Sequence, residues 1–271
     1  MISERWLIDL IVYIYTLSLL FFFSDLLHPN RRAHWLALGL LVVVWLAQIL
    51  FFAFRLASWF PALTSFDALF FYSWVLITLT LVINAVYRMD LFVFSANLIS
   101  FIVMAINLFV ARDSASPVSE ILLSELVFIH VTMAFVAYAA FSLSAVFAVF
   151  YLLGNFLLKR KKWNRVLRLL PSLDRLQSFF HRWVMIGVPL MLLSMLLGLV
   201  WLHQKFPGTP WYDPKITGSL LVLITYGLQL YFRLSGKWRG RRLAWWNLLS
   251  FFVVLLNLWI SGTGLSFHRW L

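Results

Sequence analysis

The chain has 271 residues, of which 63% are hydrophobic and only 12% are charged, and its formal net charge is +12. Its mean hydropathy of +0.91 is far above that of a water-soluble domain, so the composition excludes an ordinary soluble enzyme or binding module. Because the chain has no cysteine, disulfide bonds, iron–sulfur ligation, thiolate catalysis and thiolate–zinc sites are excluded as well.

Long apolar runs follow one another along the chain. A helix needs roughly 20 mostly apolar residues to cross the ~30 Å hydrocarbon core of a bilayer. The connections between the runs are short and polar, and the first run lacks the basic start and cleavage site of a signal peptide. The sequence predicts an all-α, polytopic membrane helical bundle, with residues 1–271 in a single transmembrane domain. About eight transmembrane helices are expected, near residues 6–27, 35–54, 67–87, 91–111, 126–157, 183–202, 216–233 and 243–262.

The basic residues are concentrated in alternate connections. Most of the 22 Lys and Arg residues follow the first, third, fifth and seventh runs. By the positive-inside rule, these connections lie in the cytoplasm and both termini lie outside the cell. The most basic segments, 158–182 and 233–242, are most simply topology anchors that contact lipid headgroups. Docking of a cytoplasmic protein is the sharper alternative, and direct binding of RNA is the least favoured.

The fifth run is unusually long. From Leu126 to Leu158 a helix would extend ~50 Å at 1.5 Å per residue, so part of it must project from the bilayer. His130 is therefore expected near or above the outer surface. Short surface helices are expected at Ser114–Leu126 outside and Pro171–Phe180 inside, and Pro189 is expected to kink the sixth helix.

The outer connection before the seventh helix is rich in proline and glycine and should be compact. Asp213 followed by Pro214 is typical of an N-cap and the first residue of a helix, and this structural role alone explains the carboxylate. Asp67 is expected to cap the third helix in the same way, with a position facing the outer site as the lesser alternative.

Three histidines, His130, His203 and His268, lie on the predicted outer side. Each alone is most simply a polar residue at the interface, just as each outer Trp is most simply part of an aromatic belt. Imidazole is, however, an axial ligand of haem iron, and aromatic rings beside an acidic group suit a flat, partly exposed macrocycle.

The convergence of His130 and His268 at the depth of the outer WYDP loop favours haem b, with these two residues as axial ligands of the iron. His203 is the alternative ligand in place of either histidine. Because a CxxCH motif needs cysteine, the haem would be non-covalent. The candidate outer site comprises the segments 126–134, 198–217 and 262–271, with the cofactor-binding residues His130, His268, Trp201, Trp211, Tyr212, Asp213 and His203.

Three stretches resemble the cytochrome c assembly superfamily of haem-handling membrane proteins, the CcsA/CcmC type, and most of all its HemX branch. The stretch FPALTSFDALFFYSW is similar to that family's FPxSNLYESLxFLSW segment, with Asp67 at the position of its Glu. HVTMAFVAYAA, which starts at His130, resembles the helix with the family's first outer histidine. GVPLMLLSMLLGLVW followed by PWYDPK resembles its Trp-rich haem-binding domain. The chain departs from the assembly enzymes by having Tyr231 near the position of a later histidine, and by lacking the Trp pair and the final Glu of their WxWDPKE core.

The resemblance to the HemX branch implies a non-catalytic regulator of tetrapyrrole biosynthesis in the bacterial cell membrane. Such a protein is a negative effector of the level of glutamyl-tRNA reductase. The basic cytoplasmic loops 158–182 and 233–242 are then the expected docking sites for this enzyme, while haem and the lipid bilayer are the other expected partners. No nucleic acid partner is expected. Two alternatives stay open: a haem transport or handling component of cytochrome c assembly, and a membrane scaffold that binds no haem.

Overall fold

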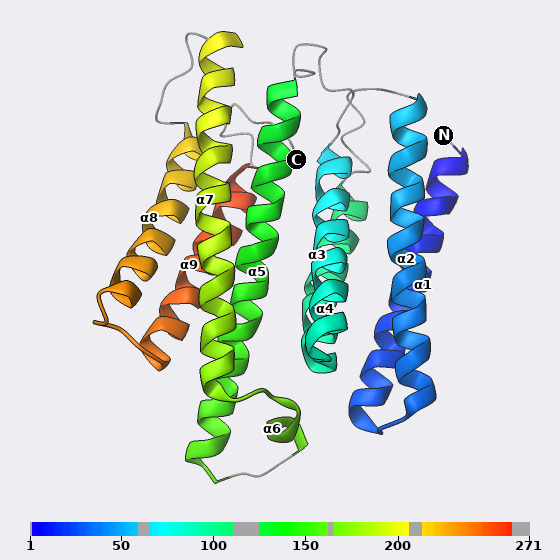
Figure 1. Ribbon diagram of the computed structural model, residues 1–271. Coiled ribbons are helices and arrows are strands. Elements are labelled where there is room, and N and C mark those ends of the chain that lie inside the picture. The colour runs from blue at the N-terminus through cyan, green and yellow to red at the C-terminus, as the bar shows by residue number, and fades with distance from the viewer. Residues whose placement is uncertain (1, 59–64, 111–124, 162–164, 206–212, 262–271) are drawn as a thin grey trace. The chain divides into compact units, whose positions relative to one another are not determined.

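The computed structural model describes residues 2–58, 65–110, 125–161, 165–205 and 213–261. The chain divides into two compact units, Met1–Val118 (unit 1) and Ser119–Leu271 (unit 2). Within the described ranges every regular element is an α-helix, which confirms the predicted all-α class. Figure 1 shows these helices.

Unit 1 contains four long helices: α1 (Ile2–Leu27), α2 (Arg31–Ser58), α3 (Ser65–Tyr87) and α4 (Asp90–Val110). Helix α1 packs against α2 and α4, and α3 packs against α4 and α2. Buried apolar side chains from all four helices form the core, among them Ile11, Tyr15, Leu41, Phe70 and Met104.

Unit 2 is built around the long helix α5 (Glu125–Lys159), which packs along α7 (Leu173–Lys205). Helices α8 (Pro214–Leu234) and α9 (Arg241–Ser261) pair with each other and pack against α7 and α5, respectively, while α6 (Arg165–Leu169) is a single short turn. The starts of α5 and α8 and the ends of α7 and α9 lie at the same end of unit 2, and we call this the His130 end (Figure 1). The opposite end of unit 2, which carries the connections from α5 to α7 and from α8 to α9, is called the basic end.

Seven of the described helices are long and apolar enough to cross a membrane, and the described apolar part of α4, Asp90–Ile106, is shorter. The chain is therefore a polytopic helical membrane protein, as predicted. Helix α5 has 35 residues, which confirms the expectation of an unusually long fifth helix.

The predicted surface helix at Pro171–Phe180 is not a separate element. Helix α7 starts at Leu173 and continues without a break for 33 residues, with Pro189 inside it. The reason is packing against α5: Phe180 is fully buried, and its carbonyl oxygen accepts a hydrogen bond from Ser144 Oγ (2.8 Å). An amphipathic segment is stabilised when its apolar face is buried. Here the segment that starts at Leu173 packs on α5 and forms the first turns of α7. Most of the predicted helix at 114–126 lies outside the described residues.

Buried amides connect helices within each unit. In unit 1, Tyr15 OH of α1 donates to Asn97 Oδ1 of α4 (2.9 Å), and Asn97 Nδ2 donates to Thr80 Oγ1 of α3 (3.0 Å). In unit 2, Asn247 Nδ2 of α9 donates to Ser144 Oγ of α5 (2.7 Å). Such polar contacts fix helix positions where no hydrophobic driving force acts between lipid-embedded helices.

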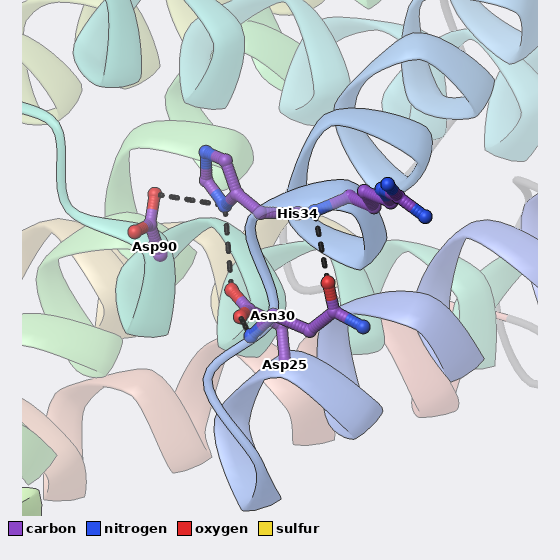
Figure 2. A network of polar contacts seen from close by, with 5 residues as sticks. Asp25, Asn30, His34 and Asp90 are labelled. Carbon is purple, nitrogen blue, oxygen red and sulfur yellow. Dashed lines mark hydrogen bonds and ion pairs between the residues drawn. The ribbon is translucent and has the colours of Figure 1, made fainter.

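A polar cluster joins three helices at one end of unit 1 (Figure 2). His34 Nδ1 of α2 lies 3.4 Å from Asp25 Oδ2 of α1 and 3.8 Å from Asp90 Oδ1 of α4. The backbone N–H of Asn30 donates to Asp25 Oδ1 (2.9 Å), and Asn30 Oδ1 accepts from Arg32 N (3.0 Å). The cluster thus fixes the turn between α1 and α2 and caps the start of α2.

Candidate functional site

His130 lies in the second turn of α5, half-buried against α7. Its Nδ1 is 2.6 Å from the carbonyl oxygen of Ser194 and 3.1 Å from Ser194 Oγ, which in turn donates to the His130 carbonyl (2.9 Å). Since a carbonyl oxygen only accepts hydrogen bonds, this contact requires the proton on Nδ1. The neutral ring then carries its lone pair on Nε2, which makes no hydrogen bond to a described residue.

The imidazole of His130 rests directly on the backbone of α7 at Gly198. A Cβ atom added to Gly198 would lie 2.7 Å from His130 Cε1 and 2.9 Å from Nδ1. Ser194 and Gly198 are four residues apart and therefore lie on the same face of the helix. Glycine is needed at this position because the ring occupies the space that any side chain would take.

Trp201 lies one turn further along α7 and is buried. It packs with Val127 and Leu202, and partly buried side chains of two neighbouring helices contact this cluster, Leu126 and Val131 of α5 and Ile216 of α8. Trp201 therefore faces the interior of unit 2 at the His130 end, in contrast to a Trp of a lipid-facing aromatic belt.

The start of α8 confirms the predicted N-cap. Asp213 Oδ1 accepts a hydrogen bond from Lys215 N (2.8 Å), and Pro214 occupies the first helical position. The side chain of Lys215 turns toward α5, where its Nζ lies 3.4 Å from Tyr138 OH and 5.6 Å from the centre of the Tyr138 ring.

The remaining predicted site residues divide into two groups. His203 is exposed in the last turn of α7, whereas the His130 ring is packed between helices. Trp211, Tyr212 and His268 lie outside the described residues.

The expectation that Asp67, which belongs to unit 1, caps the third helix was wrong. It is buried in the first turn of α3, two residues after the helix begins, and is not the N-cap. A carboxylate in this turn interacts favourably with the helix dipole.

Sequence reasoning placed Gly198 and Lys215 within the candidate segment 198–217 without giving either a role, and it did not identify Ser194 or Tyr138 as parts of the site. The one available signal was the pair of small residues at a spacing of four, which is typical of helices in close contact. Which histidine meets this pair depends on the rotation and register of α5 against α7, and these are set by packing along both helices.

The imidazole nitrogen at the His130 end is a donor that fits a haem iron. In the part of the chain that the structure describes, no group of three or more His, Asp or Glu side chains could hold a metal ion. Haem needs only axial donors from the protein, because its own ring supplies four nitrogens. A neutral imidazole with Nδ1 bound to a carbonyl oxygen is a donor of this kind.

The basic end brings the two basic connections of unit 2 together. The backbone N–H of Gly240, between α8 and α9, donates to Gln177 Oε1 of α7 (3.1 Å), and Gly240 has a φ of +58° that favours glycine. The exposed basic residues at this end are Lys159, Arg160, Lys161, Arg165, Arg168, Arg175, Arg182, Lys237, Arg239, Arg241 and Arg242.

Comparison with known proteins gives relatives over the whole chain. The family model described as cytochrome C assembly protein matches residues 62–267. "Protein HemX" of Brevibacillus brevis is 43% identical over 276 residues, covering all of both chains. "Protein HemX" of Bacillus subtilis strain 168 is 40% identical and covers 95% of this chain and 94% of its own. "Cytochrome c biogenesis protein CcsA" of Guillardia theta is 26% identical, covering 79% of this chain and 78% of its own.

Proposed function

The chain belongs to the cytochrome c assembly protein family, and we propose that it is a haem-linked, non-catalytic regulator of tetrapyrrole biosynthesis. It is a HemX-like, multi-pass bacterial membrane protein. In this proposal it acts as a negative effector of the level of glutamyl-tRNA reductase, with haem b as a non-covalent ligand at the His130 end.

The observation that carries the haem site is the contact of His130 Nδ1 with the Ser194 carbonyl oxygen at 2.6 Å. This hydrogen bond selects the tautomer in which Nε2 can bind iron, and it orients the ring and increases its basicity. When bound, haem would supply an iron that takes axial imidazole and a large apolar ring. Trp201 is positioned to contribute an apolar wall, and Asp213 holds the start of α8 beside it.

The other residues of the proposed site come from the sequence. We propose His268 as the second axial ligand and Trp211 and Tyr212 as further parts of the pocket wall. Exposed His203 is less suited to a pocket, because its ring lies on the surface of α7.

A regulator must connect ligand binding to the surface that its partner reads. Helices α5 and α7 supply such a connection, because the same two helices carry His130 and Ser194 at one end and Gln177 with the basic connections at the other. We propose that haem binding changes how α7 packs on α5, and that this change alters the basic end, where the reductase docks. The excess of exposed Lys and Arg side chains there suits an acidic protein surface.

Reductase abundance in cells tests the docking part. In a deletion strain complemented with a variant in which the charges of Lys159, Arg160 and Lys161 are reversed, we expect the basic docking surface to be lost. The reductase level should then rise toward that of the uncomplemented deletion strain. The matched control is reversal at Arg31 and Arg32, which are also exposed and predicted to be cytoplasmic but belong to unit 1. An unchanged reductase level in the first variant, measured by immunoblot at equal membrane expression, would exclude docking at this surface.

The match to the family model and to CcsA supports a second candidate, a haem-handling component of cytochrome c assembly. A deletion strain separates the two. Loss of c-type cytochromes with normal reductase level supports assembly, whereas increased reductase with normal c-type cytochromes supports regulation.

A further inference from the structure

We propose that Lys215 recognises a carboxylate of the bound tetrapyrrole and so decides which tetrapyrroles the His130 end accepts. This inference rests on the proposed haem site and adds to it a residue that discriminates between ligands by their acidic side chains.

The ammonium of Lys215 is placed toward the interior of unit 2. The side chain is half-buried, and Nζ contacts Tyr138 OH at 3.4 Å, with the Tyr138 ring centre at 5.6 Å. Tyr138 itself is buried. Among the described residues Lys215 forms no ion pair, and the carboxylate of Asp213 accepts a hydrogen bond from its backbone N–H. An ammonium has three donors, and Tyr138 takes one of them.

A partly buried cation normally has an anionic partner, because removing it from water is costly. Lysines at a membrane interface often extend outward to water or to lipid phosphate. Lys215 instead bends back over Tyr138 of α5, so a partner for its remaining donors would be a group that enters the unit.

The cation and the proposed iron ligand share one end of one unit. Ile216, the neighbour of Lys215, packs against the cluster of Trp201 and Val127, and Val127 lies one turn before His130 on α5. An imidazole nitrogen, an apolar wall and a cation together suit a ligand with a metal centre, an apolar ring and carboxylates at its edge. Haem has these three features.

The test compares haem with its dimethyl ester, in which both carboxylates are neutralised, by titrating the Soret band of the purified protein in detergent. We expect the parent protein to bind haem roughly 10- to 100-fold more tightly than the ester, as for loss of a charge-assisted hydrogen bond. Lys215→Met should bind haem about as weakly as the parent binds the ester, with its affinity for the ester unchanged, and Lys215→Arg should retain the preference for haem.

Lys237→Met is the matched control. Lys237 Nζ also lies 5.6 Å from a tyrosine ring centre, that of Tyr231, but at the basic end. This variant should keep the preference of the parent protein.

Two results would overturn the assignment of Lys215. One is a Lys215→Met variant that still prefers haem over its ester, as expected if the lysine pairs with a lipid phosphate. The other is an equal loss of affinity for both forms relative to the parent, as expected if the lysine only supports the fold. A parent protein that binds neither form would refute the haem site itself, and the role of Lys215 with it.

Discussion

The ring of His130 is positioned by backbone atoms as much as by side chains. Ser194 accepts a hydrogen bond from the ring through its carbonyl oxygen, and Gly198 leaves space for the ring because it has no side chain. The hydrogen bond selects the tautomer and the glycine admits the ring between two helices. These two features together prepare Nε2 for a ligand, in the way that a hydrogen bond to the other ring nitrogen orients histidines at metal sites.

A single methyl group at residue 198 should therefore disturb the site. We expect Gly198→Ala to displace the His130 ring, to destabilise the fold by about 1–3 kcal/mol through overpacking, and to weaken haem binding. The measurements are the free energy of unfolding and a Soret titration in the same detergent.

Gly227→Ala is the control for Gly198→Ala. Gly227 is also inside a helix, but no atom lies within 4 Å of an added Cβ. This substitution should retain haem binding and change stability by no more than about 1 kcal/mol, in the stabilising direction. Equal effects of the two substitutions would show that Gly198 has no special relation to His130.

The helices of unit 2 connect its two ends. Helix α7 extends from the basic end to the His130 end, and α8 begins beside His130 because Asp213 and Pro214 start it there. Asp213, which lies in the stretch that resembles a haem-binding domain, is thus an N-cap in the structure. Its structural and ligand-related roles can be separated by substitution.

Asp213→Ala should lower the free energy of unfolding by about 1 kcal/mol, because the N–H of Lys215 loses its acceptor. Asp213→Asn should retain most of this stability, since asparagine caps helices equally well. If the asparagine variant is as unstable as the alanine variant in thermal unfolding, then the charge of Asp213, and not the cap, is what stabilises α8.

For the molecule as a whole, the sequence predicts that the basic connections are cytoplasmic and both termini external. The absence of cysteine makes this directly testable with single introduced cysteines. A membrane-impermeant maleimide added to intact cells should label His203→Cys, because this exposed position is on the predicted outer side. It should not label Lys237→Cys or Arg32→Cys until the cells are opened. Labelling of Lys237→Cys from outside would reverse the orientation.

Much of the fold could be predicted from the sequence, because each membrane-spanning helix must be apolar over about 20 residues whatever it packs against. The start of α7 could not be, since Arg175 and Arg182 make its first turns resemble a surface helix until α5 is seen to bury Phe180. Histidine and tryptophan chemistry pointed to His130 and Trp201. The carbonyl oxygen that positions His130 has no signature in the sequence, because every residue has one.

Binding of haem by His130 can be measured from the visible spectrum of the purified protein titrated with haem. We predict saturable binding with a low-spin Soret band, and an affinity at least about tenfold lower for His130→Ala, as for loss of an iron ligand. His203→Ala, at an exposed position of the same end, should bind like the parent. No saturable band in the parent protein would instead support a membrane scaffold that binds no haem, and an unchanged affinity of His130→Ala would place the haem elsewhere.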